Sequence, residues 1–172
     1  MPKNVTVVLG SPFPGSSSEK IADFILSKLN SNKWNKYVVD LSTISAEALL
    51  LRDKSNDLDQ SIEKVTESDL IISTSPTYRA TYTGLLKSFF DQLPQDSLVN
   101  KFALAVQTGG SADHGLTIEY GMGPMLRSLG ATILSSSIYS WGEDWTEQKE
   151  PTLSLNNKIN LSVLEIAKLF EQ

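Results

Sequence analysis

Short apolar runs alternate along this chain with segments in which apolar residues recur every three or four positions. The runs are mostly valine, isoleucine and leucine, which is typical of strands buried on both faces of a parallel sheet. These predicted strands lie at 4–9, 37–41, 70–73, 101–106 and 132–139. Helical spacing predicts helices at 18–29, 58–67, 85–93, 118–129 and 159–170, and a short helix can form at 46–51.

Strands that alternate with helices predict an α/β fold with a parallel sheet and right-handed crossovers. Five such strands favour the flavodoxin-like, doubly wound order 2-1-3-4-5, with helices on both faces. The 172 residues fit a single domain, 1–172, because the chain has no internal repeat, low-complexity tract or linker. We expect Ser18 to cap the first helix, Pro94 to end the third and Gly130 to end the fourth.

Polar turns follow the first, third and fourth predicted strands, at Gly10–Ser18, Ser75–Gly84 and Thr108–Ser111. In a doubly wound sheet, ligands bind where such turns gather at the carboxyl ends of the strands. The turns therefore predict one binding site at this edge. Because they combine small hydroxyl residues, glycines and an extended Pro-Thr-Tyr segment, a flavin site is the leading interpretation.

The first turn has what a phosphate site needs, because Gly15 allows a tight turn before a helix N-terminus. Its hydroxyl donors are Ser11, Ser16, Ser17 and Ser18. The turn matches neither the Walker loop nor the Gly-x-Gly-x-x-Gly fingerprint. A serine-rich turn that merely caps a helix is the alternative interpretation of these residues.

The other two turns offer main chain and one flat side chain to a ring system. Pro76, Thr77 and Tyr78 can supply stacking area and hydrogen bonds to an isoalloxazine, and Arg79 can face negative charge. A solvated surface arginine is the alternative for Arg79. Thr108, Gly109 and Gly110 would let main chain approach a ligand closely, since the glycines carry no side chain.

A proline inside the fourth predicted helix makes a further local prediction. Pro124 has no N–H to give the carbonyl of Tyr120, and Gly121 and Gly123 loosen the same turn. We therefore expect a kink or a one-turn π-bulge at Tyr120. Such bulges are frequent at functional sites and interfaces.

Composition narrows the chemistry further. The net charge of −5, with no basic cluster, argues against a nucleic-acid partner. The absence of cysteine excludes thiolate catalysis and cysteine-bound zinc, and a single histidine, His114, makes a metal site or a Ser-His-Asp hydrolase hard to build. No apolar run approaches the ~20 residues that span a membrane, and the start has no apolar signal region, so a soluble cytoplasmic protein is expected.

These turns together resemble the NAD(P)H-dependent FMN reductase family, and within it the reductases of alkanesulfonate systems. The likeness is strongest in 75–87, 91–94 and 108–131. It implies hydride transfer from NAD(P)H to flavin N5 without a catalytic side chain, with reduced FMN passing to a partner monooxygenase in sulfonate or sulfur acquisition. It also implies a homodimer or homotetramer, with Tyr120 in a π-bulge near the subunit interface.

The resemblance further implies that FMN phosphate binds at Ser11, Ser16, Ser17 and Ser18, and that the ring binds at Pro76, Thr77, Tyr78, Arg79, Thr108, Gly109 and Gly110. The chain departs from the family in its phosphate loop, where Phe13 and a serine run replace arginine. Weak FMN binding, suited to a diffusing flavin, is therefore expected. Two alternatives stay open: an FMN-bound quinone, azo or chromate reductase, and a flavodoxin-type electron carrier.

Overall fold

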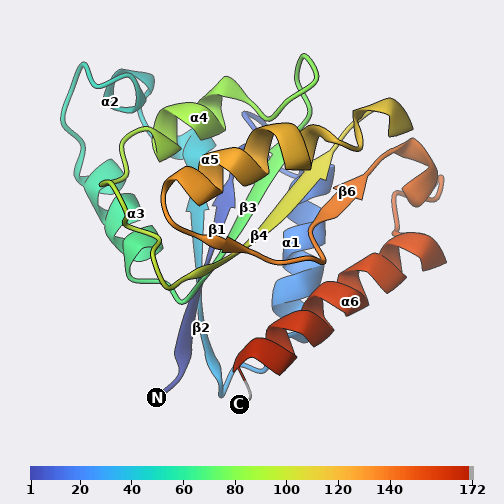
Figure 1. Ribbon diagram of the computed structural model, residues 1–172. Coiled ribbons are helices and arrows are strands. Elements are labelled where there is room, and N and C mark those ends of the chain that lie inside the picture. The colour runs from blue at the N-terminus through green and yellow to red at the C-terminus, as the bar shows by residue number, and fades with distance from the viewer. Residues whose placement is uncertain (171–172) are drawn as a thin grey trace.

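The computed structural model describes residues 1–170 and shows a twisted parallel sheet at the centre of the chain (Figure 1). Its strand order is β2-β1-β3-β4-β5, with β6 also paired to β4, so the predicted order is confirmed. The strands are β1 (Lys3–Leu9), β2 (Trp34–Asp40), β3 (Leu70–Pro76), β4 (Phe102–Thr108), β5 (Thr132–Ile133) and β6 (Ile138–Ser140).

Helices cover both faces of this sheet (Figure 1). Successive side chains of a strand point to opposite faces, so Ile71 packs with one helix layer while Leu70 and Ile72 pack with the other. One layer holds α1 (Ser17–Lys28) and α6 (Leu153–Phe170); the other holds α2 (Ala46–Leu49), α3 (Asn56–Thr66), α4 (Gly84–Phe90) and α5 (Gly123–Ser128). Burial on both faces explains why the predicted strands read as continuous apolar runs.

The last predicted strand, 132–139, is divided in the structure into β5 and β6. Between the two pieces, Ser137 Oγ accepts a hydrogen bond from the main-chain N–H of Ala105 at 3.3 Å and donates one to the carbonyl of Leu134 at 3.0 Å. A side chain thus replaces the main-chain partner that a regular strand would offer to β4. The interruption frees β6 to extend the sheet edge to Ser140, beside Thr108.

The predicted π-bulge is confirmed. A π-helix, η3 (Ile118–Met122), leads directly into α5, and the N–H of Gly123 donates to the carbonyl of Ile118. Pro124 stands at the start of α5, where its missing N–H removes the regular bond to Tyr120. The extra residue in this turn leaves Tyr120 81% exposed.

Short 3-10 turns, η1 (Leu41–Thr43), η2 (Ala112–His114) and η4 (Gly142–Asp144), complete the chain between these elements. Within residues 1–170, no helix combines the length and the apolar character needed to cross a membrane.

Candidate active site

Hydrogen bonds hold the three turns together at the carboxyl edge of the sheet. The N–H of Gly10 donates to the carbonyl of Thr74 at 2.9 Å, and that of Thr77 donates to Thr108 at 2.6 Å. Beyond β4, the N–H of Gly109 donates to Ser140 at 2.9 Å. The ladder of the sheet therefore continues into the turns, which come together as the sequence predicted.

Thr83 fastens the first turn to the second. Its hydroxyl donates to the carbonyl of Gly10 at 2.6 Å and accepts the N–H of Leu86 at 3.1 Å, which makes Thr83 the cap of α4. Gly10 has no room for a side chain, because an added Cβ would lie 2.7 Å from the carbonyl oxygen of Thr74. Main chain from two turns is thus packed together beneath the site.

The first turn ends in a capping box at the start of α1. Ser16, not Ser18, is the N-cap: its hydroxyl accepts the N–H of Glu19 at 3.2 Å, while the Glu19 carboxylate accepts the N–H of Ser16 at 3.3 Å. The expectation that Ser18 caps this helix is therefore wrong. Ser18 is fully buried beneath the turn, with its hydroxyl 3.1 Å from that of Ser16.

Ser11 also faces inward rather than toward an open loop. Its hydroxyl donates to the carbonyl of Phe13 at 2.7 Å and accepts the N–H of the same residue at 3.2 Å. The side chain thus shapes the turn and leaves Phe13 exposed to 68% at its tip.

The second turn contains a two-residue hairpin. Tyr78 and Thr81 exchange main-chain hydrogen bonds of 2.8 and 3.2 Å, and the residues between them, Arg79 and Ala80, have φ angles of +51° and +66°. Positive φ at both central positions is the type I′ arrangement, which usually selects glycine or asparagine. The hairpin leaves Tyr78 46% exposed and Arg79 exposed at its tip.

The third turn is held by Tyr139, which projects from β6. Its hydroxyl donates to the carbonyl of Ser111 at 2.6 Å. An added Cβ at Gly109 would lie 2.2 Å from that hydroxyl oxygen and 3.3 Å from Thr77 Oγ1, so any other residue would displace Tyr139. Burial raises the pKa of Tyr139, and the charge of Asp113 adds to this, against the opposing effect of the Thr77 hydroxyl.

Gln107 connects the second turn to Thr117, the residue that precedes the π-helix. This side chain is fully buried on β4, and its Nε2 donates to Thr77 Oγ1 and to Thr117 Oγ1, both at 3.1 Å. A buried amide in an apolar strand is costly unless its groups are bonded, so its role here is to fix the hydroxyl of Thr77. Its Oε1 has no hydrogen-bond partner within the described residues.

A cavity of about 290 Å³ opens between these turns. It brings together residues from every predicted turn and from the turn after β6: Ser17, Pro76, Thr77, Thr108, Gly109, Gly110, Trp141, Gly142 and Trp145. Of the predicted site residues, Ser11, Ser16, Ser18, Tyr78 and Arg79 are outside this lining. The first three form the turn beneath Ser17, and the last two form the hairpin beyond Thr77.

The turn after β6 supplies wall residues that sequence patterns did not assign to the site. Trp145 Nε1 donates to Ser140 Oγ at 2.9 Å. Asp144, whose side chain is 6% exposed, pairs with Lys158 of α6 at 2.9 Å and accepts the N–H of Trp141 at 3.3 Å. Trp141 is thus held at the cavity wall by a nearly buried carboxylate that is paired with a partly exposed lysine. In the sequence, the signal that could have indicated this wall is the pair of tryptophans that flanks two acidic residues.

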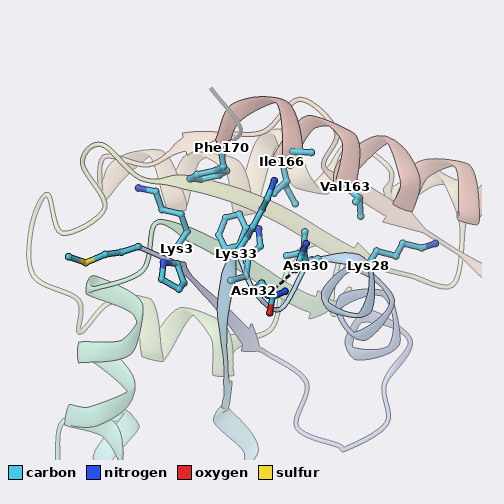
Figure 2. Close-up of a pocket in the computed structure, with 13 residues that line it drawn as sticks. Lys3, Lys28, Asn30, Asn32, Lys33, Val163, Ile166 and Phe170 are labelled. Carbon is cyan, nitrogen blue, oxygen red and sulfur yellow. Dashed lines mark hydrogen bonds between the residues drawn. The ribbon is translucent and has the colours of Figure 1, made fainter.

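A larger hollow, of about 510 Å³, lies at the opposite edge of the sheet, where the strands begin (Figure 2). Lys3 and Lys28 stand at its rim, and Val163, Ile166 and Phe170 of α6 line one side. The predicted turns contribute no residue to it. In an open α/β sheet the carboxyl edge binds ligands, so the smaller cavity is the candidate active site.

The family model for NADPH-dependent FMN reductases matches residues 3–146, which include every turn of the site. The chain belongs to this family. As a family member it is an oxidoreductase of FMN and a reduced pyridine nucleotide, and the resemblance seen in its turns is confirmed.

Individual relatives agree with this assignment. The FMN reductase (NADPH) of Escherichia coli K12 is 31% identical over 79% of this chain and 72% of its own length. The NADH-dependent FMN reductase SfnE of Pseudomonas putida is 27% identical over 98% of this chain and 93% of its own. Among solved structures, apo NADH:FMN oxidoreductase EmoB superposes with a TM-score of 0.81 at 31% identity, covering 94% of this chain and 89% of that one.

The residues at the cavity fit FMN, as the family assignment requires. Gly110, where an added Cβ would meet no heavy atom within 4 Å, leaves space for a flat ring beside Pro76 and Thr77. Ser17, which also lines the cavity, is the first residue of α1, where a phosphate would meet unpaired N–H groups.

Proposed function

We propose that this reductase takes FMN as a diffusing substrate and supplies reduced FMN to a partner monooxygenase of sulfonate or sulfur acquisition. The observation that carries the proposal is the size of the cavity. At about 290 Å³ it is at the lower limit of ligand pockets, which run from roughly 300 to 1,000 Å³. A site of this size covers part of a flavin and leaves the remainder free to depart.

The site residues take separate roles in this proposal. Pro76 and Thr77 face the ring from one side, and Thr108, Gly109 and Gly110 face it from the other. Ser17 and the turn formed by Ser11, Ser16 and Ser18 hold the phosphate end. Tyr78 and Arg79, exposed on the hairpin, bind the pyridine nucleotide as it approaches.

When bound, FMN supplies the hydride acceptor. The chain supplies orientation: Gln107 fixes Thr77, and Tyr139 fixes the third turn, Thr108–Ser111 (the glycine turn), so the main-chain groups that line the cavity do not rearrange on binding. Trp141 excludes water on the α6 side of the cavity. The reaction needs no side-chain nucleophile, in keeping with a chain that has no cysteine.

We also propose that the π-helix is a contact surface between subunits. Tyr120 and Leu116 are 81% and 63% exposed, and Gly121 packs its backbone against the hairpin, since an added Cβ there would lie 2.7 Å from Thr81 Oγ1. Large exposed apolar residues at one place favour burial in an oligomer. A homodimer or homotetramer would then bring a second subunit beside Tyr78.

The test is NADH and NADPH oxidation by the purified protein under air, with and without free FMN. Oxidation that requires added FMN and saturates with it is the expected result. A yellow protein that reduces quinone and ignores added FMN would replace the proposal with a prosthetic-group reductase. Bound flavin without any oxidation of pyridine nucleotide would indicate an electron carrier. Arg79→Ala should raise the KM for the nucleotide while leaving the fold intact.

A further inference from the structure

The first turn, Gly10–Ser18, where the phosphate is proposed to bind (the phosphate turn), already holds an anion that belongs to the chain itself. The Glu19 carboxylate accepts the N–H of Gly15 at 2.6 Å as well as that of Ser16 at 3.3 Å, both through Oε2. These N–H groups belong to the turn that leads into α1, in which Gly15 has a φ of +71°. A carboxylate bound to successive main-chain N–H groups resembles a bound phosphate in charge and in hydrogen bonding.

A flavin phosphate would therefore not find all the main-chain N–H groups of this turn free. Two of the donors of the turn are already committed to Glu19, which leaves the N–H groups of Ser17 and Ser18, the first two residues of α1. Ser17 lines the cavity that continues to the glycine turn. The phosphate thus arrives within one helical turn of a fixed negative charge.

Within residues 1–170, no lysine or arginine forms an ion pair with this carboxylate. Residues 10–18 contain no lysine or arginine, and Phe13 is exposed at the tip of the turn. Lys20 is the one basic residue in the first turn of α1, whereas Asp23 adds a second carboxylate one turn later. Burial, and next the charge of Glu19, raise the pKa of Asp23, so the field of Glu19 extends along this face of the helix.

We propose that Glu19 is a specificity-determining residue that competes with the flavin's phosphate, so that the site binds flavins mainly through the ring and discriminates little between FMN and riboflavin. This inference rests on the proposed function, because it assumes that the phosphate lies at this turn. It adds that phosphate binds weakly because the Glu19 carboxylate competes with it. Release of reduced FMN then does not have to break strong phosphate contacts.

Glu19 also caps its helix, and the test must separate the two roles. Glutamine supports a capping box as glutamate does, so Glu19→Gln keeps the hydrogen bonds and removes the charge. Glu63→Gln is the matched control, because it removes one exposed carboxylate from α3, in the opposite helix layer. Thermal unfolding should show that both variants are folded, with a small loss of stability in Glu19→Gln because the negative charge at the helix N-terminus is removed.

The experiment measures dissociation constants of FMN and riboflavin by calorimetry for the parent chain and both variants. We expect Glu19→Gln to tighten FMN about three- to fivefold, the effect of one like charge at a partly exposed site, and to leave riboflavin unchanged. Glu63→Gln should alter neither constant. Inorganic phosphate should compete with FMN more strongly in Glu19→Gln than in the parent, and should not affect riboflavin in either.

An unchanged or weakened FMN affinity in a folded Glu19→Gln variant would overturn the inference and leave Glu19 as a helix cap only. Tightening of both flavins equally would overturn it as well, because the effect would then not act through phosphate. A parent chain that binds neither flavin would instead reject the proposed function, and this inference with it.

Discussion

Gly109 offers a sharp test of how the glycine turn is built. In Gly109→Ala the new Cβ would lie 2.2 Å from Tyr139 Oη and 3.1 Å from its Cζ. Contacts below 3.0 Å do not occur at real Cβ atoms, so the ring must move. That movement stretches the 2.6 Å hydrogen bond from Tyr139 to Ser111.

The cost follows from these two effects. Overpacking of this kind costs about 2 kcal/mol, and a lost hydrogen bond adds about 1 kcal/mol, so Gly109→Ala should lower the free energy of unfolding by about 3 kcal/mol. Tyr139→Phe alone should cost about 1 kcal/mol, because it removes the hydroxyl. In the double variant, the hydroxyl no longer collides with the alanine. The lost hydrogen bond is also counted only once, so the double variant should cost at least about 1 kcal/mol less than the sum of the two single variants.

Urea denaturation of the parent, both single variants and the double variant measures this coupling. The matched control is Gly110→Ala, since a Cβ at Gly110 has no heavy atom within 4 Å. It should leave the unfolding midpoint within the range of an ordinary surface substitution, about 0.5 kcal/mol. Equal costs at Gly109 and Gly110, or strict additivity with Tyr139→Phe, would show that the contact does not decide the residue at 109.

Three further predictions concern stability away from the glycine turn. Ala80→Gly should raise the free energy of unfolding by about 0.5–1 kcal/mol in urea denaturation, because glycine adopts the φ of +66° without strain; a loss of stability would contradict the type I′ assignment. Lys158→Met should destabilise the chain by about 2–3 kcal/mol and shift its tryptophan fluorescence, because it leaves the Asp144 carboxylate, 6% exposed, without its partner. An unchanged fluorescence spectrum would mean that the ion pair does not hold the turn after β6. Burial alone would raise the pKa of Glu165, but hydrogen bonds from Ser136 and Ser135 outweigh it and lower the pKa below 4.5. The parent should therefore be more stable than Glu165→Gln at pH 7, and this difference should vanish as the pH falls through the lowered pKa. A stability difference that does not depend on pH would refute this assignment.

Local chemistry made much of the fold predictable. Apolar runs indicate burial on both faces of a strand, so periodicity predicted the strands and helices, and the alternation of the two favoured the observed strand order. The π-helix followed from one missing N–H at Pro124, because a helix bond joins residues four apart and needs no distant partner. The division of β5 from β6 was not predictable, since Ser137 bonds Ala105 of another strand.

The sequence by itself determined that three turns rich in serine, proline and glycine would meet at one edge, because parallel strands place their carboxyl ends together. Only the tertiary structure decided which of their residues line the cavity. It placed Tyr139 against Gly109, set Trp141 into the wall and brought the Glu19 carboxylate to the main-chain N–H of Gly15 in the first turn. Each of these contacts depends on backbone direction and strand register rather than on residue type, and a one-dimensional pattern does not contain that information.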